Sequence, residues 1–244
     1  LLNKIYHFLD SFCVRHCDLV WNLSTAMLRE REKKGVEKKY RRKQIIVPIG
    51  TNLNIQKLPF EKINRYEIAF MGHLRNGQGL ELLINSLPKI LKKIPQVKLV
   101  LIGTGPLEQK LKAQVLKLDI ENKVEFTGFI KNHSNLLYRL SQCAIAVAPY
   151  TDDKKNYTRY TDPGKPKAYL SSGLPVIITD IVQVAKEINK AKCGISIGFS
   201  QKELVKAIVN LLKDETKLKL YRKNAHNFAK KFEWHKIFTQ ALKK

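Results

Sequence analysis

The sequence contains no long hydrophobic run. Its apolar stretches, such as Ile45-Ile46-Val47 and Leu99-Val100-Leu101-Ile102, are far shorter than the roughly 18 residues that a membrane-spanning helix needs. The first residues also lack the order of basic, apolar and small residues that is typical of a secretory signal. We therefore expect a protein without a membrane span.

Cysteine is scarce, which excludes a disulfide scaffold. The four cysteines are Cys13, Cys17, Cys143 and Cys193, and no two of them form a Cys-x-x-Cys pair. His7 and His16 lie near the first two, but no second pair completes a tetrahedral metal site. We expect buried free thiols, no bound metal and a reducing compartment.

Acidic residues are also few: 21 Asp and Glu stand against 45 Lys and Arg, which leaves a net charge of +24. Of the basic residues 35 are Lys, whereas proteins that read base edges favour the planar fork of Arg. The aromatic residues form no stacking platform interleaved with Arg, so we expect no nucleic-acid partner.

Two interpretations of the charge stay open. The lysines could be solvated residues on helix surfaces, or they could form a basic surface that contacts anionic phosphates or an anionic membrane. We expect a cytoplasmic protein, with peripheral contact at the inner membrane surface as the open alternative.

The composition itself is globular, with 44% hydrophobic and 27% charged residues. From residue 66 onward, short β-branched runs alternate with amphipathic helical stretches, a pattern typical of βα units on a parallel sheet. The runs are Glu67–Met71, Lys98–Ile102, Lys123–Thr127, Cys143–Ala148, Val176–Thr179 and Gly194–Ile197. They predict an α/β fold with a doubly wound, Rossmann-like parallel sheet over residues 66–231.

Residues 1–50 have a different pattern. Asp18–Leu23 reads as a strand, Ser24 as an N-cap, Thr25–Lys34 as a helix and Gln44–Ile49 as a second strand. Two strands cannot bury themselves, so this segment predicts the C-terminal part of a preceding acceptor-side domain. A linker over residues 51–65 follows. Residues 232–244 predict a C-terminal crossover helix that could pack back on residues 1–50.

Glycine-rich turns follow the first three predicted strands of the sheet, at the end where open parallel sheets bind ligands. The first turn runs from Gly72 to Gly79, so its N–H groups could approach an anion. Gly103-Thr104-Gly105 follows the second strand. Gly128-Phe129-Ile130 follows the third, and its backbone could pair with a base edge. A tight turn without a ligand explains such glycines equally well.

The loop after the fourth predicted strand ends in Asp162-Pro163-Gly164-Lys165, ahead of a helix that runs to Ser172. Asp162 and Pro163 are first of all a good N-cap and first helical residue. A functional interpretation is compatible with that role, because Lys165 adds a cation at a helix N-terminus that itself favours an anion. We therefore expect a pyrophosphate to bind at the helix start near Pro163.

Four motifs in sequence order carry a family resemblance. They are Gly72-His73-Leu74 with Gly79-Leu80, Leu101 to Pro106, Phe126 to Phe129, and Asp162 to Lys165 followed by Tyr169-Leu170 and Gly173 to Ile177. Together they resemble the C-terminal, donor-binding half of family 4 retaining glycosyltransferases of the GT-B fold. The resemblance covers roughly residues 66–244, and residues 17–52 look like the end of that family's N-terminal domain.

The resemblance implies transfer of a sugar, with retention at the anomeric carbon, from a nucleotide diphosphate sugar to a glycan or lipid-linked acceptor. Such reactions assemble surface polysaccharides or glycolipids. The resemblance also implies no metal and no further cofactor, since Lys, Arg and helix N–H groups can stabilise the diphosphate leaving group. Without the acceptor half, we expect this chain to bind a donor and to turn over nothing.

The sequence departs from the family pattern at charged positions. The family's Arg and Lys of the first glycine-rich turn fall on His73 and Gln78, and Arg75 could replace one of them. Its two glutamates fall on Tyr160 and Ala168. Either a divergent enzyme uses Asp162, Lys165 and Arg75, or the chain is a non-catalytic binding or scaffold domain. We favour the first, because the Asp-Pro-Gly-Lys turn is hard to explain without an anion.

These arguments give a set of candidate site residues. Asp162 and Lys165 are the candidate catalytic residues, and no metal ligand is expected. The candidate donor-binding residues are Gly72, His73, Arg75, Gln78, Gly79, Gly103, Thr104, Gly105, Phe129, Ile130, Tyr160, Gly164, Ala168 and Tyr169.

Overall fold

A sheet of six parallel strands is the centre of the fold. The computed structural model describes residues 2–53, 58–153 and 155–243. The strands are β3 (Asn64–Met71), β4 (Lys98–Ile102), β5 (Val124–Gly128), β6 (Cys143–Ala148), β7 (Val176–Thr179) and β8 (Gly194–Ile197). Their order in the sheet is β5-β4-β3-β6-β7-β8. This is the doubly wound order in which the connections reverse direction between β3 and β6, so the predicted fold class is confirmed.

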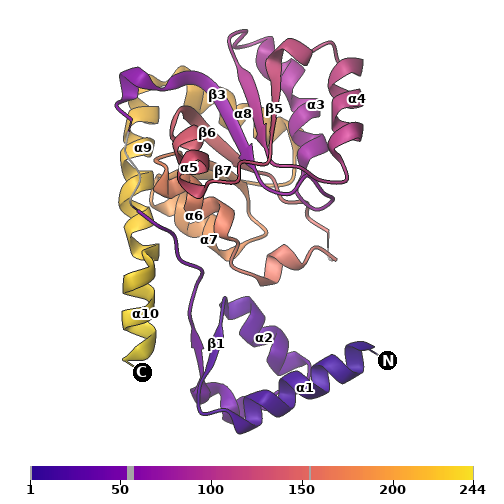
Figure 1. Ribbon diagram of the computed structural model, residues 1–244, viewed down its shortest axis with the longest axis vertical. Coiled ribbons are helices and arrows are strands. Elements are labelled where there is room, and N and C mark those ends of the chain that lie inside the picture. The colour runs from indigo at the N-terminus through magenta and orange to yellow at the C-terminus, as the bar shows by residue number, and fades with distance from the viewer. Residues whose placement is uncertain (1, 54–57, 154, 244) are drawn as a thin grey trace.

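Helices cover both faces of this sheet (Figure 1). They are α3 (Leu80–Leu91), α4 (Glu108–Lys117), α5 (His133–Ser141), α6 (Gly164–Ser171), α7 (Gln183–Lys190), α8 (Gln201–Lys213) and α9 (Glu215–Ala229). Because side chains alternate along a strand, Ile68 and Phe70 of β3 pack in one core cluster with α3, α4 and α8. Ala69 between them packs in a second cluster with α5, α6 and α7.

The N-terminal residues form a smaller unit beneath the sheet in this view (Figure 1). It contains α1 (Leu2–His16), β1 (Val20–Asn22), α2 (Thr25–Lys33), a 3-10 helix (Lys38–Lys43) and β2 (Gln44–Ile46). The two strands pair in parallel and are shorter than the sequence predicts. Ser24 caps α2 as predicted, because its hydroxyl accepts the Met27 N–H at 3.0 Å. Among the described residues, no helix is long and apolar enough to span a bilayer.

The chain returns to this unit at its C-terminal end. Helix α10 (Trp234–Leu242) stacks Trp234 on Phe238, with ring centroids 5.3 Å apart, and Phe238 lies 6.2 Å from the Trp21 ring of β1. The segment predicted as a linker is partly structured: Thr51 forms a bridge with Glu233, a 3-10 helix spans Phe60–Lys62, and β3 already begins at Asn64. Residues 54–57 of that segment lie outside the described residues.

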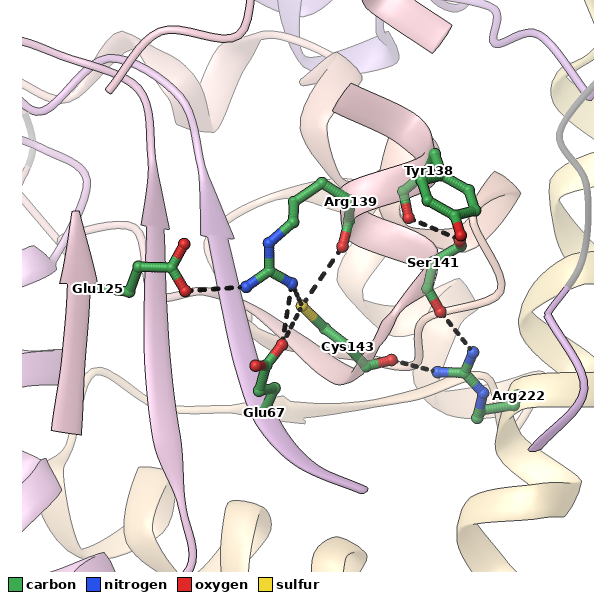
Figure 2. Close-up of polar contacts among 7 residues, drawn as sticks. All are labelled: Glu67, Glu125, Tyr138, Arg139, Ser141, Cys143 and Arg222. Carbon is green, nitrogen blue, oxygen red and sulfur yellow. Dashed lines mark hydrogen bonds and ion pairs between the residues drawn. The ribbon is translucent and has the colours of Figure 1, made fainter. Parts of the chain in front are cut away.

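Arg139 of α5 holds together the amino end of the sheet (Figure 2). Its guanidinium bonds Glu67 of β3 at 2.9 Å and Glu125 of β5 at 3.0 Å. Cys143, the first residue of β6, is buried beside this pair, and burial raises the pKa of its thiol to about 12. Arg222 of α9 donates to the Cys143 carbonyl at 2.7 Å. The cluster therefore connects helices α5 and α9 to strands β3, β5 and β6. Its thiol stays in the unreactive, protonated form.

All four cysteines are free, but only two of them agree with the expectation of buried thiols. Cys143 and Cys193 are buried, whereas Cys13 and Cys17 are exposed at the C-terminal end of α1. Residues 2–16 form a helix that was not predicted, and the surface position of its C-terminal end leaves both thiols exposed.

We predict that Arg139→Met lowers the free energy of unfolding by about 3 kcal/mol, because Glu67 would keep a largely buried carboxylate without its cationic partner. Chemical denaturation followed by circular dichroism measures this loss. Lys110→Met is the matched control: it breaks the exposed Lys110–Glu81 pair and should cost at most about 1 kcal/mol. Equal losses in the two variants would contradict the role given to Arg139.

Candidate functional site

A pocket of about 340 Å³ opens where β3, β4 and β5 end. Six of the predicted donor-binding residues line it, together with apolar side chains of the strand ends and of α5. The lining residues are Met71, Gly72, His73, Ile102, Gly103, Thr104, Phe129, Ile130 and Leu136. The structure thus brings the three predicted turns together at the carboxyl edge of the sheet, where their order along the chain led us to expect them.

Two of these turns touch backbone to backbone, and this contact requires glycine. Gly103 has a φ of +127°, and a Cβ added there would collide with the carbonyl oxygen of Gly72. A Cβ on Gly105 would likewise collide with the carbonyl oxygen of Leu74. Gly105 therefore holds the first two turns together and does not line the pocket.

Lys165 lies at the rim of this pocket, beside Gly72. A Cβ added to Gly72 would lie 2.8 Å from Lys165 Nζ, and that ammonium donates to the side-chain oxygen of Gln78. The Nζ lies 4.8 Å from the centroid of the Phe70 ring and 5.4 Å from that of Tyr150. These residues come from the ends of β3 and β6, so Lys165 occupies the point where the sheet connections reverse direction.

Arg75 supplies a second cation close by. Its guanidinium donates to the hydroxyl of Tyr157 and lies 5.1 Å from the centre of that ring. Burial, with a smaller contribution from the charge of Arg75, lowers the pKa of Lys165 to about 7. Among the described residues, neither cation forms an ion pair with a carboxylate. The rim is thus a place where positive charge is held without a counter-ion from the protein.

The loop after β6 fastens the first glycine-rich turn. Asn156 donates from its side chain to the Gly77 carbonyl at 3.0 Å, and the Thr151 N–H donates to the same oxygen at 3.1 Å. A Cβ on Gly79 would collide with the carbonyl oxygen of Pro149. Sequence reasoning missed Asn156 and Tyr157, because their partners lie about eighty residues earlier in the chain and leave no local pattern.

Tyr169 holds the backbone of Met71, one of the residues that line the pocket. Its hydroxyl accepts the Met71 N–H at 2.7 Å and donates to the Met71 carbonyl at 3.2 Å, and burial raises its pKa. Tyr160 and Ala168, at the positions of the family's glutamates, do not line the pocket. The Tyr160 carbonyl accepts the Ser24 hydroxyl at 2.5 Å, and Ala168 packs in the second core cluster.

Asp162 has a different structural role from the predicted one. Helix α6 begins at Gly164 with Pro163 as its N-cap, so Asp162 is not the cap and Pro163 is not the first helical residue. The Asp162 carboxylate instead accepts the Ile49 N–H at 2.7 Å and pairs with the fully buried ammonium of Lys167. Burial raises the pKa of Asp162 and lowers the pKa of Lys167, against the mutual attraction of the two groups.

The start of α6 offers fewer free N–H groups than we expected. Pro166 in its first turn has no N–H, so Gly164 and Lys165 alone can present theirs there. The Gly164 Cα faces Ile49, whose Cγ2 would lie 3.4 Å from an added Cβ. The cationic side chain of Lys165, more than the helix end, is thus the feature that suits an anion.

Known proteins are similar to this chain in sequence or in fold. An uncharacterised glycosyltransferase of Methanocaldococcus jannaschii is 29% identical over 172 residues, which are 69% of this chain and 35% of that protein. Alpha-monoglucosyldiacylglycerol synthase of Streptococcus pneumoniae is 27% identical over 68% of this chain and 36% of its own length. The chain therefore spans about a third of the length of the curated relatives it matches.

Among solved structures, HepE of Anabaena in complex with UDP superposes with a TM-score of 0.78 at 20% identity, over 95% of this chain and 64% of that one. The similarity shows that the two share a fold. Residues 54–230, well over half of the chain, match the family described as glycosyl transferases group 1, and the chain belongs to that family.

Proposed function

We propose that this chain is the donor-binding part of a glycosyltransferase that takes a sugar from a nucleoside diphosphate sugar. The observation that carries the proposal is the pocket at the ends of β3, β4 and β5, with Lys165 beside Gly72 of its lining and the cation of Arg75 near Lys165. Family membership supports the reaction class, and the complex of HepE with UDP supports a uridine donor as the first to test.

The pocket suits the parts of such a donor. Its walls of Met71, Ile102 and Leu136 suit a planar base, and the backbone around Phe129 and Ile130 can pair with the base edge. The diphosphate would then extend toward Lys165 and Arg75. Their positive charge would stabilise the diphosphate most strongly as the glycosidic bond breaks, because negative charge develops on the leaving group at that moment.

Three finer features of the reaction belong to the same proposal. Retention at the anomeric carbon rests on the resemblance to family 4. Independence of a metal rests on the two cations, which can supply the positive field at the diphosphate. A lipid-linked acceptor is supported by the name of the pneumococcal relative, alpha-monoglucosyldiacylglycerol synthase, and a glycan remains the alternative acceptor of the proposal. A lipid-linked acceptor would bring the protein to a membrane surface, where a net charge of +24 favours anionic lipids.

We also propose that residues 2–50 belong to the acceptor-side domain of the whole protein. Apolar side chains of α1 are exposed there, among them Leu2, Ile5, Phe8 and Phe12. A two-stranded sheet offers no face that could cover them. Transfer would then require the full-length protein, and this chain alone would bind donor without turnover.

We predict that UDP-glucose binds to the chain and that Lys165→Met weakens this binding by about tenfold to a hundredfold, since a charge-assisted hydrogen bond contributes about 1.5–3 kcal/mol. Isothermal titration calorimetry measures both affinities. Lys98→Met, at the opposite end of β4, is the control and should bind as the unsubstituted chain does. A folded chain that binds none of UDP-, GDP- or ADP-sugars would overturn the proposed function.

We further predict that the affinity for UDP-glucose falls as the pH rises above 7. Lys165 has a pKa of about 7 in the free protein, and the diphosphate raises it, so binding above pH 7 must take up a proton. Below pH 7 the lysine is already protonated, and this dependence disappears. Each pH unit above 7 should raise the Kd by up to about tenfold. Titrations between pH 6 and 9 test this, and Lys165→Met should remove the dependence.

A second candidate is a domain that binds a nucleotide sugar without catalysing transfer. It is favoured by one observation: none of the described side chains that line the pocket is acidic. The resemblance to family 4 also puts Ala168 at the position of a glutamate. Introducing Ala168→Glu into the full-length protein separates the two functions. A gain in transfer would favour a weakened enzyme, whereas unchanged binding without any transfer would favour the non-catalytic domain.

A further inference from the structure

Ile49 lies in the segment where the chain crosses from the N-terminal unit to the sheet. We define this crossing as residues 47–51. Both backbone polar groups of Ile49 are held by one buried pair of charges: its N–H donates to Asp162 at 2.7 Å, and its carbonyl accepts the Lys167 ammonium at 2.6 Å. Lys167 is fully buried, and its Nζ lies 4.5 Å from the centroid of the Phe232 ring.

The residues that follow Ile49 are fastened as well. Gly50 lies against the indole of Trp234, and a Cβ at Gly50 would collide with that ring. The Thr51 N–H donates to the Phe232 carbonyl at 2.7 Å, and its hydroxyl donates to Ser171 of α6 at 3.1 Å. The crossing therefore contacts α6 through Thr51 and the start of α10 through Gly50.

The same helical turn serves the donor pocket. Lys165 and Lys167 are two residues apart in α6, which places their side chains on opposite sides of the helix. Lys165 reaches Gln78 and Gly72 at the pocket rim, whereas Lys167 reaches the crossing. The chain just before α6 also contacts the N-terminal unit, because the Ser24 hydroxyl donates to the Tyr160 carbonyl.

We propose that Asp162 and Lys167 are positioning residues that fix the orientation of the N-terminal unit relative to the donor pocket. They hold the crossing against the turn that carries Lys165, and they touch neither the pocket nor its cations. Asp162 thereby has a role other than the catalytic one that its place in the sequence suggested. Only the consequence for sugar transfer rests on the proposed function; the mechanical role does not.

The test measures the orientation directly. Spin labels at Lys34→Cys in the N-terminal unit and Lys206→Cys on α8, in a Cys13→Ser/Cys17→Ser background, report the distance between the two parts by double electron–electron resonance. Lys167→Met should widen the distance distribution by about twofold, because the Ile49 carbonyl loses the buried ammonium that holds it. Lys186→Met, an exposed lysine of α7, is the control and should leave the distribution unchanged.

Donor affinity provides the second readout. Lys167→Met should change the Kd for UDP-glucose by less than about threefold, while Lys165→Met weakens binding by about tenfold or more. If the Lys167→Met chain does not fold, Asp162→Asn/Lys167→Met, which removes both buried charges, takes its place with the same expectations.

Two results would overturn the proposal: a distance distribution as narrow as that of the unsubstituted chain, or a loss of affinity equal to that of Lys165→Met. A chain that binds no nucleotide sugar at all would instead refute the proposed function, and the distance measurement would still decide the positioning role. In the full-length enzyme, the proposal predicts a lower kcat with an unchanged KM for the donor.

Discussion

Two lysines on one turn of α6 have opposite surroundings, Lys167 fully buried beside a carboxylate and Lys165 partly buried beside another cation, and the candidate function depends on the difference. Removing an ammonium group from water is costly unless a partner compensates for the lost hydration. Lys167 has such partners, the Asp162 carboxylate and the Ile49 carbonyl. Lys165 has an amide oxygen and two aromatic faces, and the charge that acts on it is another cation, Arg75. An anion at the rim of the pocket would supply the negative charge that Lys165 does not receive from the protein.

The sheet could be predicted from the sequence because each strand is a short β-branched run between turns. The predicted and observed bounds agree for β4, β6, β7 and β8, and β5 is shifted by a single residue. Helix α1 could also have been found, since Leu2, Ile5, Leu9 and Phe12 have helical spacing. The N-cap prediction for Asp162 failed for a physical reason: a buried lysine five residues later competes for the carboxylate more strongly than the backbone N–H groups of the helix do.

Site residues whose positions depend on contacts between distant segments could not be predicted from the sequence. The three turns were predictable because each follows a strand and the strands are parallel. The placement of Lys165 beside Gly72 was not, since it depends on how α6 packs against β6 and β7. Tyr157 and Asn156 have the same origin, because a loop of varied polar residues gives no periodic pattern. Of the candidate residues, those in turns gather around the pocket, while Tyr160 and Ala168 are involved in packing and backbone contacts elsewhere.

The lowered pKa of Lys165 has a consequence for the electrostatics around that side chain. A carboxylate near Lys165 would keep the lysine charged but would also repel a diphosphate; without it, the lysine is partly neutral until the anion arrives. The protein then spends little stability on a buried charge in the free state, and the attraction appears only when the ligand is bound. Because the charge on the diphosphate grows as the glycosidic bond breaks, a lysine that takes up a proton from water when the donor binds would stabilise the departing group more than the intact donor. Such an arrangement needs no acidic residue beside Lys165, which is compatible with the proposed donor site.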